Sequence, residues 1–324
     1  MKTLRKFSIP LSILIMSASA TTFAQPYPTV KPVRIVAATQ PGTSTDVIAR
    51  LFADGLSRNT NHRFLVENRG GGGGNIGLSF VAKSVPDGYT LALGNLGGSI
   101  LNQYMYPSLD FDPEKDFEPI VLIAGLPFVI AVNADYPAKN LQDLINMAKA
   151  KPGEINVALD SSSVRAANAL LAATSGINLF AIQYNGPAAA ITDTLSGRVP
   201  VIMETLGGLR SLISSGKLRA IAVTTLRTSE LLPGVNSVAE QGLPGFGELT
   251  GWVGLIAPKG TPRDVITMLN TEVNKILALP ETKQRYNSIG AEIRSGSPKD
   301  FADFQAAERA RFGPLIKAAG IKAE

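Results

Sequence analysis

The sequence predicts an α/β protein built from two lobes. Short runs of Val, Ile, Leu and Ala alternate along the chain with amphipathic segments of helical spacing, a pattern typical of parallel strands joined by helices. The chain holds too many of these units for one compact sheet, and no low-complexity linker interrupts them. We therefore expect two doubly wound sheets, one in each lobe.

The elements before residue 100 form strand–helix–strand units. Continuous apolar residues predict strands, and apolar residues that recur every three or four positions predict helices. On this basis we expect strands at 33–37, 64–66 and 90–93 and helices at 47–56 and 76–83. Parallel strands in this arrangement place the loops that follow them at one edge of the sheet.

The same patterns continue through the rest of the chain. We expect strands at 128–132, 155–159, around 182, 199–203, 218–223 and 252–257, and helices at 141–149, 265–277 and 301–317. The last two helices have strongly amphipathic spacing, which predicts that each covers one face of a sheet.

The chain is expected to pass between the lobes twice. The apolar run 120–132 is interrupted by Gly125 and Pro127, which predicts two separate strands with a lobe boundary between them. The glycine-rich stretch 241–247 is placed to return the chain. We therefore assign residues 25–124 plus 248–324 to lobe 1 and residues 125–247 to lobe 2, with a hinge at the crossings and a cleft between the lobes.

The first 24 residues have the features of a secretory signal peptide. Lys2, Arg5 and Lys6 precede a short apolar run at 7–16, and small residues lead to a cleavage site after Ala24. Cleavage leaves 28 basic against 26 acidic residues, a net charge of +2, so the sequence offers no support for nucleic-acid binding. We expect a protein exported to the periplasm; an uncleaved N-terminal anchor is the alternative.

The composition excludes several kinds of chemistry. The chain has no cysteine and one histidine, so it cannot form a disulfide, a thiol nucleophile, a cysteine-ligated metal site or a multi-histidine site. A Ser-His-Asp triad would have to use His62, which we expect to be exposed and without a catalytic partner. The acidic run 110–116 lacks the glycine and terminal glutamate of an EF-hand and fits a solvated turn. We expect no metal, no cofactor and no enzymatic activity.

The loop at 40–46 is the most informative local feature. It joins a predicted strand to a predicted helix, where backbone N–H groups attract anions and where doubly wound sheets bind their ligands. Ser44 or Thr45 can cap the helix, and Asp46 can accept backbone N–H groups near the first turn. The loop is either a cradle for a carboxylate or phosphate or a simple capped helix.

A run of five glycines, 70–74, follows the second predicted strand. With Gly77 it formally matches G-x-G-x-x-G, but successive glycines match many patterns, and no acidic residue lies about 20 positions later to bind a ribose. Dinucleotide binding is therefore disfavoured. We expect a turn whose backbone approaches a ligand or the other lobe closely.

A second hydroxyl-rich loop follows the strand predicted at 155–159. Ser161, Ser162 and Ser163 are suited to hydrogen bonding with an oxyanion. They are equally suited to capping a helix. The residues themselves leave both interpretations open.

Eight stretches, in one register, together resemble a known family. They are 27–36 (YPTVKPVRIV), 41–50 (PGTSTDVIAR), 66–69 (VENR), 74–77 (GNIG), 86–91 (PDGYTL), 111–117 (FDPEKDF), 216–224 (GKLRAIAVT) and 257–262 (APKGTP). Each motif is weak alone, but the ordered set spans nearly the whole chain after residue 24. The set resembles the extracytoplasmic solute-binding proteins of tripartite tricarboxylate transporters, the Bug family.

This resemblance implies a two-lobed periplasmic binding protein, type II-like and of the Venus-flytrap kind. Its usual ligands are small carboxylates (dicarboxylates, tricarboxylates, acidic amino acids or aromatic acids), held mainly by loop N–H groups, hydroxyls and waters. Its partners are membrane permease subunits, and we expect a monomer. The residues expected to contact the ligand are Thr39, Gln40, Gly42, Thr43, Ser44, Asp46, Asn95, Gly97, Ser161, Ser162, Ser163, Arg165, Tyr184 and Glu204.

The first loop departs from the family pattern. Thr43 stands where the family has a second glycine, and threonine avoids positive φ, so the loop either changes shape or offers an extra hydroxyl. Thr39 and Gln40 replace an aromatic residue and a proline, which makes this side of the cleft more polar.

The second loop departs further. The segment 160–165 is shorter than the family pattern and lacks its glycines, and Arg165 falls near the usual histidine. Arg165 could pair with a ligand carboxylate, or it could pair with Asp160 and leave the ligand alone. Glu204 stands where Asp or Asn is common. The identity of the ligand therefore does not carry over from the family.

The function expected from sequence is capture followed by delivery. A small carboxylate-containing ligand docks on the first loop, the second lobe closes over it, and the closed form is presented to a membrane permease. A ligand-binding co-receptor of a signalling system would use the same cleft and is the main alternative. A periplasmic hydrolase is a further alternative, which the histidine content disfavours.

Overall fold

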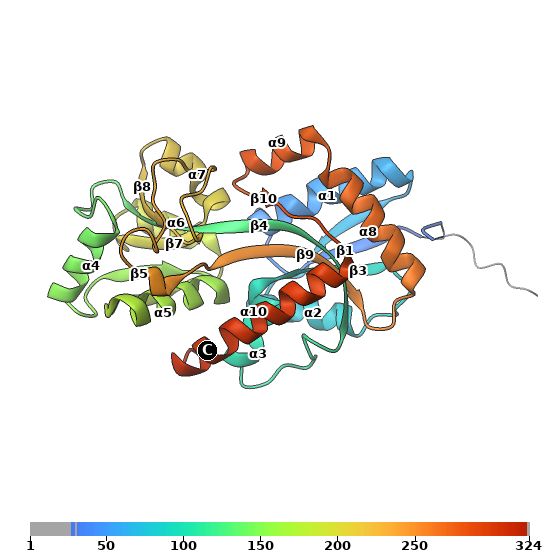
Figure 1. The fold of residues 1–324 in the computed structure, drawn as a ribbon, viewed down its shortest axis with the longest axis horizontal. Coiled ribbons are helices and arrows are strands. Elements are labelled where there is room, and N and C mark those ends of the chain that lie inside the picture. Colours follow the sequence, from blue (N-terminus) through green and yellow to red (C-terminus); the bar gives the residue numbers. More distant parts are fainter. Residues whose placement is uncertain (1–26, 30, 323–324) are drawn as a thin grey trace, which may run out of the picture.

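The computed structural model describes residues 27–29 and 31–322 of the chain. The expected signal peptide, residues 1–24, and its cleavage site lie outside the described residues. Figure 1 shows two lobes joined by two long strands, β4 (Phe117–Asn133) and β9 (Thr250–Pro258). The smaller lobe is drawn in green to gold, and the larger lobe combines the blue N-terminal and the orange and red C-terminal segments. The two-lobed α/β architecture is therefore as predicted.

The strands belong to one connected mixed sheet with two parts that share β4. Sheet A has the order β2 (Phe64–Asn68), β1 (Val33–Ala37), β3 (Thr90–Asn95), β9 and β4, and β10 (Glu292–Ile293) also pairs with β4. Sheet B has the order β4, β7 (Val201–Thr205), β5 (Asn156–Leu159) and β6 (Phe180–Gln183), and β8 (Leu218–Val223) also pairs with β4. β2, β1 and β3 run parallel to each other, as do β6, β5 and β7.

The predicted break in the long apolar run is wrong. The run forms one strand of 17 residues, which pairs with β9 up to Pro127 and with β7 from Phe128 onward. Gly125 and Pro127 thus mark the change from sheet A to sheet B without ending the strand. Hydrogen bonding to neighbours on both sides keeps the backbone extended where local preference alone would break it.

The helices lie on both faces of the sheet parts. They are α1 (Ser44–Thr60), η1 (Gly72–Gly74), α2 (Asn75–Ala82), η2 (Gly97–Leu101), α3 (Asn102–Met105), α4 (Leu141–Ala150), α5 (Ser162–Ser175), α6 (Pro187–Leu195), α7 (Leu206–Ser214), η3 (Pro244–Phe246), α8 (Arg263–Leu277), α9 (Pro280–Ser288) and α10 (Pro298–Ala318). The five predicted helices correspond to α1, α2, α4, α8 and α10. α5 and α6 escaped prediction because their alanine, serine and threonine residues give weak apolar periodicity, and α7 escaped because it spans only 9 residues.

Helix α1 shows how the sequence sets both ends of an element. Thr43 caps its N-terminus by accepting the N–H of Asp46 at 3.3 Å, so the cap lies one residue before the predicted Ser44 and two before Thr45. Phe52 and Leu56 are fully buried one turn apart and face the core under sheet A. Asn61, in the left-handed conformation, ends the helix.

Three helices begin where parallel strands end. α1 follows β1, α5 follows β5 and α7 follows β7, each after a short loop or none. The N-termini of α1, α5 and α7 therefore gather at the carboxyl edge of the strands, with α1 in the larger lobe and α5 and α7 in the smaller one. Within the described residues, none of the helices has the length and apolar character needed to cross a membrane.

Candidate functional site

A cleft of about 740 Å³ lies between the lobes at the carboxyl edge of the strands. Residues from both lobes line it, including the starts of α1, α5 and α7. The cleft brings together twelve of the fourteen residues predicted to contact a ligand: Thr39, Gln40, Thr43, Ser44, Asn95, Gly97, Ser161, Ser162, Ser163, Arg165, Tyr184 and Glu204. Residues distant in sequence thus converge on one site.

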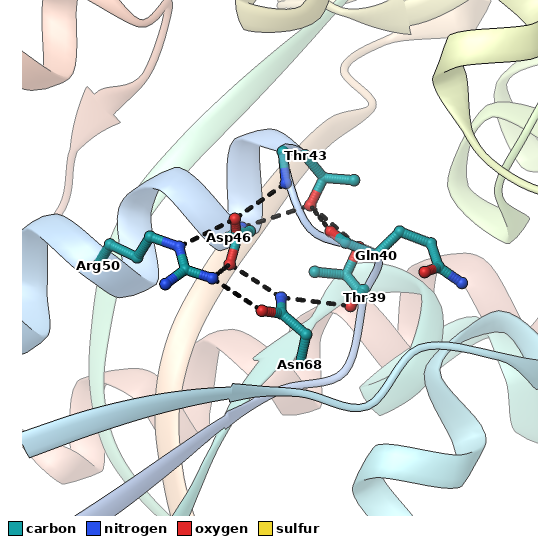
Figure 2. A network of polar contacts seen from close by, with 7 residues as sticks. Thr39, Gln40, Thr43, Asp46, Arg50 and Asn68 are labelled. Carbon is teal, nitrogen blue, oxygen red and sulfur yellow. Dashed lines mark hydrogen bonds and ion pairs between the residues drawn. The ribbon is translucent and has the colours of Figure 1, made fainter.

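The first loop is shaped by a polar network that Figure 2 shows. The Thr43 hydroxyl donates to the carbonyl of Gln40 at 3.0 Å, and it lies 3.1 Å from the Thr39 hydroxyl. Thr43 has φ −73°, so the positive φ that threonine avoids is not required there, and Gly42 takes the positive value of 82° instead. Thr43, which stands where the family pattern has a glycine, therefore serves as the helix cap.

Asp46 and Gly42 do not line the cleft, although both were predicted ligand contacts. Asp46 is 3% exposed and points behind the loop, where it accepts the Gly42 N–H at 2.9 Å and the Asn68 amide at 2.8 Å (Figure 2). Arg50 forms an ion pair with it at 3.0 Å. Burial opposes ionisation of Asp46, but these hydrogen bonds and the guanidinium charge outweigh it and lower the pKa of the carboxyl. Asp46 thus holds the loop in shape from outside the cleft.

The second loop combines a helix cap with the cleft wall. Ser161 caps α5 by accepting the N–H of Val164 at 3.4 Å, and it also lines the cleft. Ser162 and Ser163 are buried at the first turn. The first N–H groups of a helix have no partner within the helix, so this turn and that of α1 offer donors to an anion from two sides.

Arg165 lines the cleft without a carboxylate partner. Among the described residues it forms no ion pair, and its guanidinium donates to the Ser162 hydroxyl at 3.4 Å. Its Nε atom is buried and lacks a hydrogen-bond partner there. The alternative in which Arg165 pairs with Asp160 is therefore wrong, and its charge is free to act in the cleft.

Two acidic side chains meet at the floor of the cleft. Asp160 follows β5 and Glu204 ends β7, and these strands are hydrogen-bonded neighbours. Burial, and next the adjoining Glu204 carboxylate, raise the pKa of Asp160 well above its usual value. Glu204 is 8% exposed, and its Oε1 accepts both the N–H and the hydroxyl of Thr205, at 2.7 and 2.6 Å. Sequence analysis singled out Glu204 but missed this pairing.

Contacts between α1 and α7 connect the two lobes beside the cleft. The hydroxyls of Ser44 and Thr205 are 3.0 Å apart and share a hydrogen bond. Gly207 packs so closely on the loop after α9 that an added Cβ would lie 2.3 Å from the Ile289 carbonyl oxygen and 2.8 Å from the Ser44 hydroxyl. Only glycine permits this approach of α7 to the larger lobe.

The glycine run forms part of the wall, and Gly71, Gly72, Gly73 and Gly74 all line the cleft. They take positive φ values, and a Cβ on Gly73 would lie 2.9 Å from the Tyr106 hydroxyl and 3.2 Å from that of Ser162. Ser162 belongs to the smaller lobe, so the backbone of this turn approaches the other lobe closely, as predicted.

Apolar side chains that sequence analysis missed form another wall. Leu126 and Phe128 come from β4 and Trp252 from β9, so this wall is built on the two strands that join the lobes. Trp252 packs edge-on against Phe301 and Phe304 of α10, with ring centroids 5.5 and 5.7 Å apart. Leu126 and Phe128 both belong to the apolar run at 120–132, which sequence analysis noticed. Its assignment as two separate strands concealed that these two side chains face the cleft.

Tyr184 lines the cleft, but its hydroxyl is engaged elsewhere. It donates to Asp193 Oδ2 at 2.8 Å, and Asp193 also pairs with Arg198. Burial and the Asp193 carboxylate raise the pKa of Tyr184 to about 12. Only the ring of Tyr184 is therefore available to the cleft in this arrangement.

The remaining titratable candidates lie outside the cleft. His62 is half-buried rather than exposed, and a ring nitrogen lies 2.7 Å from the Lys31 carbonyl oxygen. In the acidic turn, Asp110 pairs with Lys83 and Asp112 with Lys115. The described part of the chain contains no group of His, Asp and Glu residues arranged to hold a metal ion.

Comparisons with known proteins agree with this geometry. The family model of the tripartite tricarboxylate transporter family receptor (TctC) matches residues 48–321. BugT of Bordetella pertussis is 31% identical over 97% of this chain and 97% of its own length. The structure of R. palustris Rpa4515 with adipate has 34% identity and a TM-score of 0.87, over 91% of this chain and 99% of that one.

MatC (Rpa3494) of Rhodopseudomonas palustris, solved with bound malate, has 27% identity and a TM-score of 0.82, over 89% of this chain and 99% of that one. The fold, the extent of the family match and these relatives agree with the resemblance seen in the motifs. The chain belongs to the tripartite tricarboxylate transporter receptor family, to which the Bug proteins are related.

Proposed function

We propose that the protein is a periplasmic solute-binding protein that captures a small carboxylate in the cleft and delivers it to the permease subunits of a tripartite tricarboxylate-type transporter. The observation that carries the proposal is the convergence of the α1 and α5 N-termini on one cleft in a chain of this receptor family. Helix N-termini favour anions through their unpaired N–H groups and their dipoles. The relatives solved with adipate and malate support the same ligand class.

A ligand carboxylate fits best at the first turn of α1. Ser44 and Thr45 line the cleft there, and their backbone N–H groups have no acceptor within the helix. Arg165, on the opposite lobe, supplies the unpaired positive charge of the cleft wall. Leu126, Phe128 and Trp252 then bury the carbon skeleton of the ligand, a combination typical of small-molecule sites. Recognition needs no cofactor and no catalytic group.

Closure accompanies capture in this proposal. The lobes comprise residues 25–124 plus 248–324 and residues 125–247, with the hinge where β4 and β9 pass between them. A ligand that touches both α1 and α5 binds the closed form better than the open form, and this difference drives closure. Small-angle scattering should show compaction when a tight-binding ligand saturates the protein, and an unchanged radius of gyration would contradict closure.

A thermal-shift screen tests the ligand class. The protein starting at Gln25 is mixed with mono-, di- and tricarboxylates, aromatic acids, and neutral and cationic solutes of similar size. A ligand at 100 times its dissociation constant should stabilise by about 2.7 kcal/mol, a shift of several degrees for a chain of this length. A refolded sample controls for ligand retained during purification. If only neutral or cationic solutes raise the melting temperature, the carboxylate class is wrong.

Gene deletion tests the role in transport. Loss of the protein should abolish uptake of the ligand found in the screen, because in this proposal capture by the receptor precedes transport. If uptake persists while a ligand-induced response disappears, the protein is a signalling co-receptor instead of a transport receptor. A hydrolase would convert the ligand into a product, which mass spectrometry of the binding mixture would detect.

A further inference from the structure

The acid pair on the cleft floor is a feature that a plain carboxylate receptor does not need. Asp160, Glu204 and Arg165 are the charged side chains among the cleft-lining residues that the structure describes. Two of these three are acidic and adjoin each other, so the part of the cleft beside them repels anions while the α1 turn and Arg165 attract them. The cleft therefore offers sites of opposite charge preference close to each other.

Glu204 places its own carboxylate beside the residue that caps α7. Its Oε1 accepts the N–H and the hydroxyl of Thr205, the cap of α7, at 2.7 and 2.6 Å. An internal carboxylate thus already fills the anion-binding end of this helix. Bringing a second ligand carboxylate to the same place would set like charges together in a water-poor site, which is strongly unfavourable.

One carboxyl oxygen of Asp160 lacks a hydrogen-bond donor. Its Oδ1 atom is inaccessible to solvent and has no hydrogen-bond partner among the described residues. A buried acceptor left without a donor is costly, and native proteins rarely retain one without a functional reason. Asp160 lines the cleft, so a donor on the ligand can reach this side chain.

We propose that Asp160 and Glu204 form a specificity-determining subsite for the ammonium group of an amino-bearing carboxylate. An ammonium supplies three donors and the positive charge that the pair lacks, while a second carboxylate supplies neither. The inference rests on the proposed function, because the carboxylate end of the same ligand binds at α1. Selection works both by attraction of the amine and by repulsion of dicarboxylates.

The two ends of such a ligand have room to bind together. Ser44 at the α1 turn is connected to Glu204 through Thr205 by two successive hydrogen bonds of 3.0 and 2.6 Å. The anion-binding turn and the acid pair are thus near neighbours, and one small zwitterion reaches both. The charges that face Asp160 in the cleft are Glu204 on β7 and, farther along α5, Arg165.

Binding of the amine should release a proton. Burial and the Glu204 carboxylate raise the pKa of Asp160, so its carboxyl binds a proton more readily than a free aspartic acid does. An ammonium placed beside Asp160 favours the ionised form of this carboxyl and displaces the proton. Calorimetry in two buffers with different heats of ionisation measures this release directly, and a purely structural acid pair would show none.

A matched set of six-carbon acids tests the subsite. Hexanoate carries one carboxylate, adipate adds a second, and 6-aminohexanoate and norleucine add an amine at the far end or beside the carboxylate. We expect at least one amino acid of the set to bind about ten-fold tighter than both hexanoate and adipate, as a desolvated charge pair would give. The same comparison is made between each acid found in the wider screen and its amino counterpart.

Variants separate recognition from folding. Glu204→Gln keeps the acceptor for Thr205 and removes the charge of Glu204. Asp160→Asn removes the charge of the other member of the acid pair. Each should cut the preference for the amine to about three-fold or less while carboxylate binding persists, with circular dichroism and melting temperature confirming the fold. If amine-free acids bind at least as tightly as their amino counterparts, or if both variants keep the preference, the inference is overturned and the proposed function stands. If no carboxylate binds at all, both fall.

Discussion

Replacement of Asp46 by alanine tests whether the first loop is held in shape from behind. The carboxylate is 3% exposed and accepts the Gly42 N–H and the Asn68 amide at 2.9 and 2.8 Å, while Arg50 pairs with it from a half-exposed position. Loss of two hydrogen bonds to a charged acceptor costs about 1.5 kcal/mol each, the helix dipole adds a few tenths, and the solvated ion pair adds little. We expect a total loss of about 3–4 kcal/mol in the free energy of unfolding.

Urea denaturation of Asp46→Ala measures this loss, and Asp54→Ala is the matched control. Asp54 lies on the same helix but is exposed, so its replacement should change stability by less than about 0.5 kcal/mol. The ligand found in the screen should also bind Asp46→Ala more weakly, because the Thr43 and Ser44 side of the cleft loses its fixed position. If Asp46→Ala is as stable as the control, the loop does not depend on this network.

The pH dependence of the difference supplies a second test. The pKa of Asp46 is lower in the folded protein than its ordinary value of 3.8, so the carboxylate stabilises the fold above that pH. This contribution disappears as the pH falls through the lowered pKa of the folded state. The stability gap between the wild-type protein and Asp46→Ala should therefore be constant near neutral pH and shrink below about pH 4. A gap that grows in acid would refute the assigned sign.

Three further predictions concern the cleft and its hinge. Gly207→Ala should weaken ligand binding about five-fold or more and lower the melting temperature, because the new Cβ forces α7 away from the Ile289 carbonyl oxygen. Gly245→Ala, where a Cβ meets only ordinary contacts, should leave both the calorimetric affinity and the melting temperature unchanged. Arg165→Gln should lower carboxylate affinity about ten-fold by calorimetry and change the free energy of unfolding in urea by less than about 1 kcal/mol. If the variant and the wild-type protein bind the carboxylate equally well, Arg165 does not belong to the site. Burial raises the pKa of Glu308 from 4.5 to about 7, so protonated Glu308 stabilises the fold below pH 4.5, and this contribution is lost as the pH rises through 7. Glu308→Gln should therefore gain stability relative to the wild-type protein between about pH 5 and about pH 8. Stability curves of the two proteins that run parallel over this range would contradict the prediction.

Local sequence patterns were reliable where one element determines its own structure. The strand at 33–37, the loop and the helix that follows were predicted from apolar runs and a capping signal, and Thr43 and Asp46 act within one helical turn of that loop. The cap itself was assigned one or two residues late, because several adjacent hydroxyl residues fit the same signal. A short-range pattern fixes the type of element better than its first residue.

Patterns failed where partners distant in sequence decide the outcome. Gly125 and Pro127 predict a strand break, but pairing with β9 on one side and β7 on the other keeps β4 continuous. Helices α5 and α6 bury several alanine, serine and threonine side chains against the sheet of the smaller lobe, so their helical faces carry little apolar contrast in the sequence. In both cases tertiary contacts override weak local preference.

The sequence by itself determined the α/β class, the family and most of the residues that surround the cleft, because strand ends and helix starts carry recognisable composition. Only the tertiary structure decided which of these side chains face one another. It turned Asp46 away from the cleft, left Arg165 without an acidic partner and brought Asp160 against Glu204 across neighbouring strands. The physical reason is that charge and hydrogen-bond partners depend on distances of a few ångströms between segments tens of residues apart, and those distances are set by sheet register and by the approach of the two lobes.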